Sequence, residues 1–130
     1  MQLYLVRHAD ATPGNPDELR PLSDAGHEQA RELGERLRDD GVAPDVVLTS
    51  PLLRARQTGE ALASATGSTA EADERLAPGA TAEQVREAVS GRGENVVVVG
   101  HQPDCGRIAA ALRGDEEPPF PPAGMAVIQL

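Results

Sequence analysis

Near its N-terminus the chain reads Leu3-Tyr4-Leu5-Val6-Arg7-His8-Ala9-Asp10. A short apolar run without helical spacing stops here at an arginine, a histidine and a carboxylate. This pattern is typical of a buried β-strand that presents polar side chains at its C-terminal end. Ligands of open α/β sheets bind at that end of the strands. We therefore expect a functional site to form around Arg7 and His8.

Two later apolar runs end in the same manner. Residues 46–49 lead into Ser50, and residues 95–99, which include four valines, lead into Gly100 and His101. β-Branched residues of this kind favour strands. If these strands are parallel neighbours of the first one, their C-terminal ends meet at one edge of the sheet.

Four segments show helical spacing together with local start or stop signals. Ser23 is a good N-cap, Thr81 and Gln84 have the spacing of a capping box, and Gly41 and Gly67 follow the last helical positions. The predicted helices cover residues 23–40, 52–66, 81–90 and 103–112.

The order of these elements predicts the fold class. A weak strand signal lies within residues 68–76, and residues 126–130 form a last strand. Strands that alternate with helices indicate an α/β fold, here a three-layer αβα sandwich with a mostly parallel central sheet. The length suits one core, and no repeat or linker interrupts the pattern, so we expect one domain over residues 1–130.

The composition indicates which partners the protein can bind and in which cell compartment it works. The chain has 12 arginines, no lysine and 21 acidic residues, which gives a net charge of -9. Such an acidic surface repels nucleic acids and anionic membranes. A single cysteine, Cys105, rules out an internal disulfide, and no segment resembles a signal peptide or a membrane span. We expect a soluble, cytoplasmic protein.

The strand ends and the following helices bring several polar residues to one site. Arg7 and His8 follow the first strand, Ser50 and Arg54 the second, and His101 the third. Guanidinium groups match the oxygens of a phosphoryl group in bidentate geometry, and helix N-termini add N–H donors. A cluster of cations in an acidic protein therefore predicts an oxyanion site, in which Ser50 is a further ligand.

Histidine chemistry extends this prediction to catalysis. A neutral imidazole can attack phosphorus and form a covalent phosphohistidine, which divides one displacement into two easier steps. The reference pKa of about 6.5 leaves a free nitrogen on His8 near neutral pH. Arg7, Arg54 and His101 would stabilise the charge of the transition state.

The same residues allow alternatives to the phosphohistidine mechanism. The most specific of these is a metal site on His8, Asp10 and His101, although Arg7 would repel a divalent cation. A Walker loop requires a lysine, which the chain lacks. Cys105 lacks the following arginine of a cysteine phosphatase, so we expect a packed thiol.

These motifs together resemble those of the histidine phosphatase superfamily, also called the phosphoglycerate mutase-like family. Arg7-His8 is similar to its signature dipeptide, the run from Ser50 to Thr58 to its second motif, and Gly100-His101 to its third. Residues 21–26 are similar to the entrance of its first helix. The short chain looks most like the SixA-type phosphohistidine phosphatases, small members without an inserted cap over the site.

The resemblance implies a role for each matching residue. His8 is the phosphorylated nucleophile, and Arg7, Arg54 and His101 form the phosphate pocket. Arg20, on the long loop beside the site, is a further candidate substrate ligand. A glycine usually follows the signature histidine in the family, and Ala9 stands there, which is compatible with any backbone that does not need a positive φ.

Relatives that act on phosphate esters use a carboxylate to protonate the leaving oxygen. Asp73 and Glu74 lie in the corresponding segment, and Asp10 is another possible donor. None stands in a convincing motif, and a labile N–P bond needs less acid assistance.

We therefore predict a metal-independent phosphatase that needs no cofactor and acts in signalling. Its substrate would be a protein that carries phosphohistidine. One alternative is a phosphatase of small phosphorylated metabolites, and another is a catalytically idle phosphate-binding module.

Overall fold

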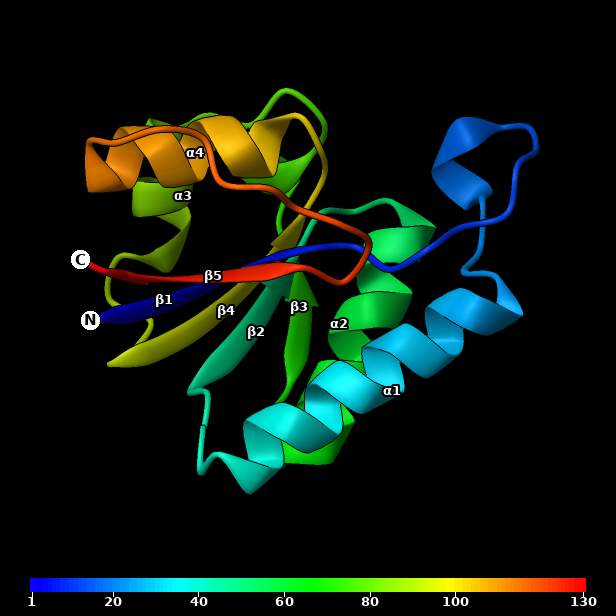
Figure 1. Ribbon diagram of the computed structural model, residues 1–130, viewed down its shortest axis with the longest axis horizontal. Coiled ribbons are helices and arrows are strands. Elements are labelled where there is room, and N and C mark those ends of the chain that lie inside the picture. The colour runs from blue at the N-terminus through cyan, green and yellow to red at the C-terminus, as the bar shows by residue number, and fades with distance from the viewer.

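A five-stranded sheet lies between two pairs of helices in the computed structural model, which describes residues 1–130 (Figure 1). The strand order is β3-β2-β4-β1-β5, and every pair is parallel except the antiparallel pair of β1 and β5. The strands are β1 (Gln2–Arg7), β2 (Val46–Thr49), β3 (Ala70–Ala72), β4 (Asn95–Gly100) and β5 (Met125–Gln129). The predicted three-layer α/β fold is confirmed.

The helices begin and end close to the positions that the local signals predicted. They are α1 (Asp24–Asp39), α2 (Leu53–Thr66), α3 (Ala82–Val89) and α4 (Asp104–Arg113). Ser23 accepts a hydrogen bond from the Gly26 N–H at the start of α1, and the capping box of Thr81 and Gln84 is formed. Gly67 ends α2 in the left-handed conformation, at a φ of 73°.

Each face of the sheet has its own apolar layer. Leu3 and Leu5 of β1 belong to the cluster that also holds Val85 of α3 and Ile108 of α4. The alternating residues of β1 point to the opposite layer, which α1 and α2 cover. Aliphatic side chains fill both layers, as expected for a chain with so few aromatic residues.

The weakly predicted segments hold short elements. β3 is a three-residue edge strand beside β2, and a 3-10 turn, η2 (Glu74–Leu76), follows it. The long loop after β1 contains a second 3-10 turn, η1 (Asp17–Leu19), and is closed by a bridge between Ala11 and Leu22. The element order contains no cap insertion. No helix is both long and apolar enough to cross a bilayer.

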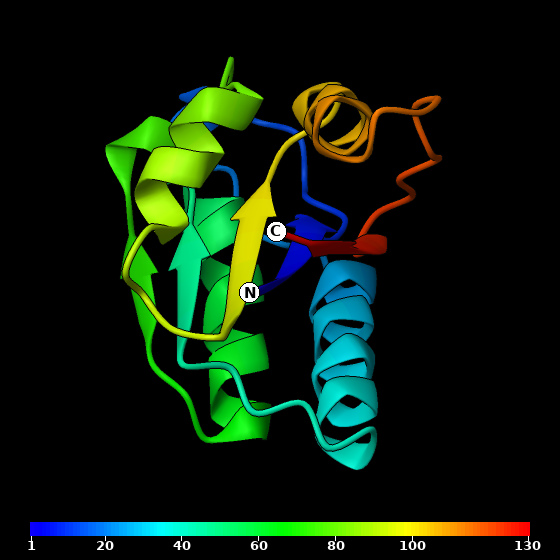
Figure 2. The same cartoon turned by 90° about the vertical axis from the view of Figure 1, so that its left-hand side faces the viewer.

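The strand directions separate the two ends of the sheet. The arrowheads of β2 and β4 point the same way in Figure 2, and β1 is parallel to β4. The termini meet at the opposite end (Figure 1), where the Leu130 N–H donates to the Met1 carbonyl over 2.8 Å. The polar residues that follow β1, β2 and β4 therefore share one edge.

Candidate active site

His8 and His101 lie next to one another at this edge. Arg7 pairs with Gly100 in the parallel register of β1 and β4, so the two histidines follow adjacent strands at the same level. Their ring centroids are 5.1 Å apart in an edge-to-face arrangement. The convergence of the strand ends predicted from sequence is thus present.

The His8 ring has a defined tautomer. Its Nδ1 lies 2.7 Å from the carbonyl oxygen of Ala9, and a carbonyl oxygen can only accept a hydrogen bond. Nδ1 therefore carries the hydrogen, and Nε2 carries the free lone pair. Burial lowers the pKa of His8, the bond to Ala9 opposes this effect, and the positive charges of Arg54 and Arg7 add to the lowering. The ring is neutral at neutral pH, with a nucleophilic Nε2.

Ala9 fits its position without strain. Ala123 is the one non-glycine residue with a positive φ, so the backbone at Ala9 does not require glycine. The Ala9 methyl is fully buried, and its N–H donates to Oγ1 of Thr58 over 3.1 Å. Thr58 ends the second motif of the sequence, and its hydroxyl fixes the peptide that follows His8.

Ser50 supports His101. The hydroxyl of Ser50 lies 2.7 Å from Nε2 of His101, and both residues are buried. The Leu52 N–H also donates to this hydroxyl, over 3.2 Å. Burial lowers the pKa of His101 to about 3, and the positive charge that His8 carries when protonated and the charge of Arg54 lower it further. His101 is therefore a neutral ring, held from the end of β2.

Arg7 is anchored by the segment before β5. Its Nη1 donates to the Phe120 carbonyl over 2.9 Å, and its backbone N–H donates to the Gly124 carbonyl over 3.0 Å. Its buried Nε has no hydrogen-bond partner within the protein. An unpaired buried donor is costly, so this group is suited to an anion oxygen. Sequence reasoning missed this anchor, because carbonyl groups leave no side-chain signal.

Arg54 lies in the first turn of α2 and reaches the long loop after β1. Its Nη1 donates to the Asp17 carbonyl over 2.9 Å, and its Nη2 donates to the Asp17 carboxylate over 3.1 Å. Arg20 donates to the same carboxylate over 3.1 Å and to the Thr12 carbonyl over 2.7 Å. The structure thus brings Arg20 to Arg54 through Asp17, a residue that the sequence did not single out.

The three candidate proton donors have other hydrogen-bond partners or are exposed. The carboxylate of Asp10 accepts from the Ser23 hydroxyl over 2.7 Å, at the start of α1. Asp73 pairs with Arg75 over 2.8 Å, and this pairing lowers the pKa of the Asp73 carboxyl. Glu74 is exposed on η2. Their proposed role stays a prediction.

Two further expectations concern metal and thiol chemistry. No group of three or more His, Cys, Asp and Glu side chains is placed to hold a metal ion, so His8, Asp10 and His101 do not form the alternative metal cluster. Cys105 is fully buried, and burial raises its pKa to about 12. It is the packed thiol that the sequence predicted.

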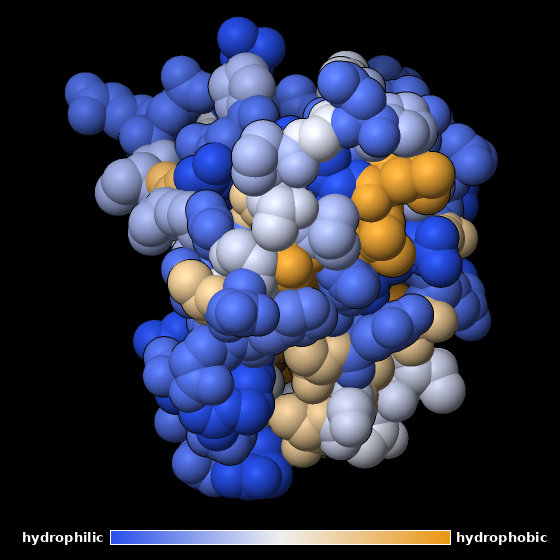
Figure 3. Space-filling view, turned by 90° about the vertical axis from the view of Figure 1, so that its right-hand side faces the viewer, coloured by the Kyte–Doolittle hydropathy of each residue, from blue (hydrophilic) through white to orange (hydrophobic).

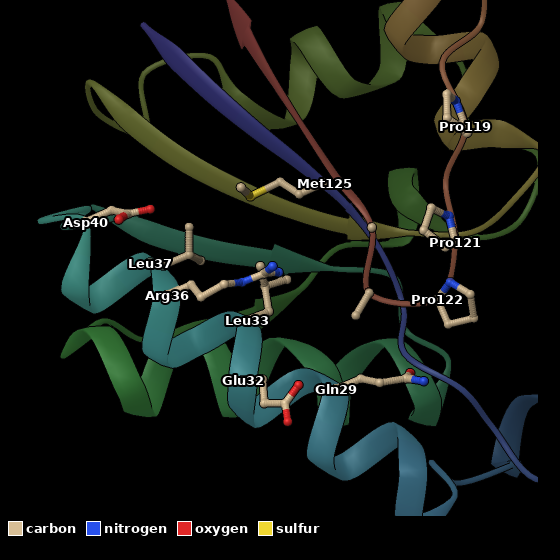
Figure 4. Close-up of a pocket in the computed structure, with 12 residues that line it drawn as sticks. Gln29, Glu32, Leu33, Arg36, Leu37, Asp40, Pro119, Pro121, Pro122 and Met125 are labelled. Carbon is tan, nitrogen blue, oxygen red and sulfur yellow. The ribbon is translucent and has the colours of Figure 1, made fainter.

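A surface groove lies elsewhere, between α1 and the proline-rich segment before β5 (Figure 4). Leu33 and Leu37 of α1 and Pro121 and Met125 are among its lining residues, and none of the predicted site residues lines it. The histidine and arginine cluster is therefore a separate feature at the sheet edge.

Comparison with known proteins places the chain in a family. Residues 3–78 match the sequence model of the histidine phosphatase superfamily (branch 1), and the chain belongs to this superfamily. It is 33% identical over 127 residues to phosphohistidine phosphatase SixA of Escherichia coli, which covers 92% of this chain and 79% of that protein. An uncharacterized protein of Picosynechococcus is 38% identical over 120 residues, covering 86% of this chain and 73% of that protein.

A solved structure agrees with this assignment. The protein histidine phosphatase SixA complexed with tungstate superposes with a TM-score of 0.91 and 30% identity, covering 100% of this chain and 88% of that chain. The phosphoglycerate mutase-like fold implied by the sequence motifs is confirmed.

Proposed function

We propose that the protein is a phosphatase that transfers a phosphoryl group from a protein phosphohistidine to His8 and then to water. The observation that carries the proposal is the Nδ1 contact to the Ala9 carbonyl, which leaves Nε2 of His8 free beside His101. Membership of the superfamily and the similarity to SixA support it. A cytoplasmic signalling role is part of the same proposal.

The reaction has two displacements. Nε2 of His8 attacks phosphorus, and the bond from phosphorus to the substrate nitrogen breaks with its electron pair on that nitrogen. If the other ring nitrogen of the substrate is protonated, the leaving group departs as a neutral imidazole. Water then attacks phosphorus, and the bond from phosphorus to Nε2 of His8 breaks with its electron pair on Nε2. The attacking water loses a proton to solvent, inorganic phosphate leaves, and Nε2 is free again.

The surrounding donors supply the electrostatic part of catalysis. Arg7 and Arg54 hold the phosphoryl oxygens, and the unpaired Nε of Arg7 is one such donor. His101 lies in the same pocket and stabilises the charge of the transition state. The hydroxyl of Ser50 orients its ring. Arg20 adds a further charge at the loop. Losing one donor of this kind typically costs about 10²- to 10³-fold in rate.

Two features of the site support a phosphohistidine protein as the substrate: the engagement of the candidate proton donors and the absence of a cap. A phosphohistidine needs little acid assistance, and two of the three candidate donors are engaged in other hydrogen bonds. The side of the molecule that bears η1 is mostly hydrophilic, with small separate apolar patches (Figure 3). No cap insertion follows the strands, so a large protein substrate can approach. If the substrate were a small phosphate ester, Asp10, Asp73 or Glu74 would be needed for turnover.

The test compares phosphate release from a phosphohistidine protein, a sugar phosphate and an aryl phosphate. We expect the highest kcat/KM on the phosphohistidine protein, and equal or better turnover of the sugar phosphate would overturn the substrate class. His8→Ala should abolish release and covalent labelling by a radioactive phosphoryl donor, whereas the exposed His27→Ala should keep both. Release that matches wild type in His8→Ala would refute the mechanism.

Cofactor independence is tested separately with a chelator. We expect full activity after exhaustive treatment with EDTA. Activity that is lost and returns only with an added divalent cation would overturn this part of the proposal.

A further inference from the structure

Asp17 of η1 is hydrogen-bonded to both arginines on the helix and loop side of the site. One carboxylate oxygen accepts from Nη2 of Arg54 over 3.1 Å, and the other accepts from Nη1 of Arg20 over 3.1 Å. The Asp17 carbonyl accepts a further bond from Nη1 of Arg54 over 2.9 Å. Two candidate phosphate ligands are thus joined through one residue.

The two ends of this contact differ in exposure. The Arg54 side chain is 8% exposed, whereas the Asp17 side chain is 59% exposed. A buried guanidinium requires partners, because removing its water is costly. Two of its five N–H groups are used on Asp17, which leaves three for a bound anion. Asp17 therefore fixes one edge of the Arg54 guanidinium group, and the other N–H donors of Arg54 remain available.

The loop that carries Asp17 is itself held in place. The bridge between Ala11 and Leu22 closes its base, and the Thr12 N–H donates to the Pro21 carbonyl over 2.9 Å. Nε of Arg20 donates to the Thr12 carbonyl. These contacts give η1 a fixed position over Arg54, so the Asp17 contact can orient that side chain.

We propose that Asp17 is a positioning residue, which holds the Arg54 and Arg20 guanidinium groups in the orientation that the phosphoryl transition state requires. The inference rests on the proposed function, because it assumes that these arginines bind the transferred group. The competing view is that Asp17 is an anionic plug, whose removal frees the arginines for the substrate.

The two views predict opposite changes in turnover. Removing the Asp17 charge strengthens the positive field and favours ground-state anion binding, while the loss of orientation weakens transition-state binding. As a positioning residue, Asp17→Ala should lower kcat about 10-fold, less than the roughly 10²-fold that a 1 Å misplacement can cost. The dissociation constant of inorganic phosphate should change far less than kcat.

The experiment measures kcat on a phosphohistidine protein and phosphate affinity by calorimetry for Asp17→Ala, Asp17→Asn and Glu18→Gln. Asp17→Asn keeps one acceptor oxygen and should lie between Asp17→Ala and wild type. Glu18 is exposed and makes no hydrogen bond to either arginine, so Glu18→Gln controls for the lost charge and should match wild type.

Unchanged or higher kcat in Asp17→Ala, with tighter phosphate binding, would overturn the positioning role in favour of the plug. Thermal unfolding of each variant shows whether the fold is intact. If wild type itself released no phosphate, the proposed function would fail and this inference with it. An active wild type with an equally active Asp17→Ala would refute the inference alone.

Discussion

Nε2 of His101 and the hydroxyl of Ser50 lie 2.7 Å apart in the buried edge between β4 and β2. Replacing Ser50 with alanine leaves the ring nitrogen and the Leu52 N–H without this partner. We expect Ser50→Ala to lose about 1–3 kcal/mol of unfolding free energy and to lower kcat/KM. Urea denaturation and steady-state kinetics measure both effects. Ser64→Ala, at an exposed position of α2, is the control, and equal stability of the two variants would contradict the expectation.

The pKa of about 3 for His101 predicts a stability that depends on pH. The folded ring stays neutral where the unfolded ring, with a pKa of about 6.5, takes up a proton. This contribution to stability is therefore complete well above pH 6.5 and falls as the pH drops from 6.5 toward 3, by at most about 1.4 kcal/mol per pH unit for one proton. His8 contributes in the same direction.

Denaturation of His101→Asn across this range should show a shallower fall than wild type. His27→Asn, at an exposed position of α1, is the control variant. An unchanged slope in His101→Asn would mean that other groups cause the pH dependence.

Arg54 and Arg56 offer a matched pair in the first turn of α2. Arg54 is buried with bonds to Asp17, whereas Arg56 is exposed. A lysine cannot reproduce the planar fork of a guanidinium. Arg54→Lys should lower kcat/KM about 10²- to 10³-fold, and Arg56→Lys should leave it near wild type. Similar kinetics of the two variants would rule out the proposed role of Arg54.

Gly26 has a steric role at the entrance of α1. A Cβ at this position would collide with the Asp10 carbonyl, which accepts from the Ser23 N–H. An alanine in place of glycine normally stabilises a helix by about 1 kcal/mol. Gly26→Ala should instead destabilise by about 1–3 kcal/mol, measured by thermal or urea unfolding. A gain in stability would contradict the close packing of α1 on the loop.

Cys105 should be inert in the folded protein. Its thiol is buried, and its pKa is raised to about 12, so almost no thiolate exists at pH 8. An aromatic disulfide reagent should react with Cys105 only as fast as the protein unfolds, and at once in denaturant. Rapid labelling of native protein would contradict this expectation.

The part of the site that could be predicted from sequence follows strong local signals. His8, Ser50 and His101 each come directly after a buried strand, and Arg54 lies in the first turn of a helix with a clear stop at Gly67. Strand ends and helix caps depend mainly on neighbouring residues. The sequence therefore predicts that these side chains lie together, provided that the strands are parallel neighbours.

The residues that sequence reasoning missed act through tertiary contacts. Asp17 lies in a loop without periodicity, and its contact to Arg54 depends on how that loop folds back. Phe120 supports Arg7 through its carbonyl group, which any residue carries. The hydroxyl of Thr58 accepts from the Ala9 N–H, a bond that joins two segments far apart in the sequence. No local pattern encodes such contacts.

The pairing of β1 has a consequence for the synthesis of the protein. The strand that ends at Arg7 is made first, yet its two neighbours are β4 and β5, which are made late. The hydrogen bond from Arg7 to the Phe120 carbonyl also cannot form until Phe120 has been made. Such distant pairings close slowly, because a long loop must be ordered before they form. A growing chain on the ribosome therefore cannot complete the contacts of Arg7 and β1 until residues 120–129 have emerged.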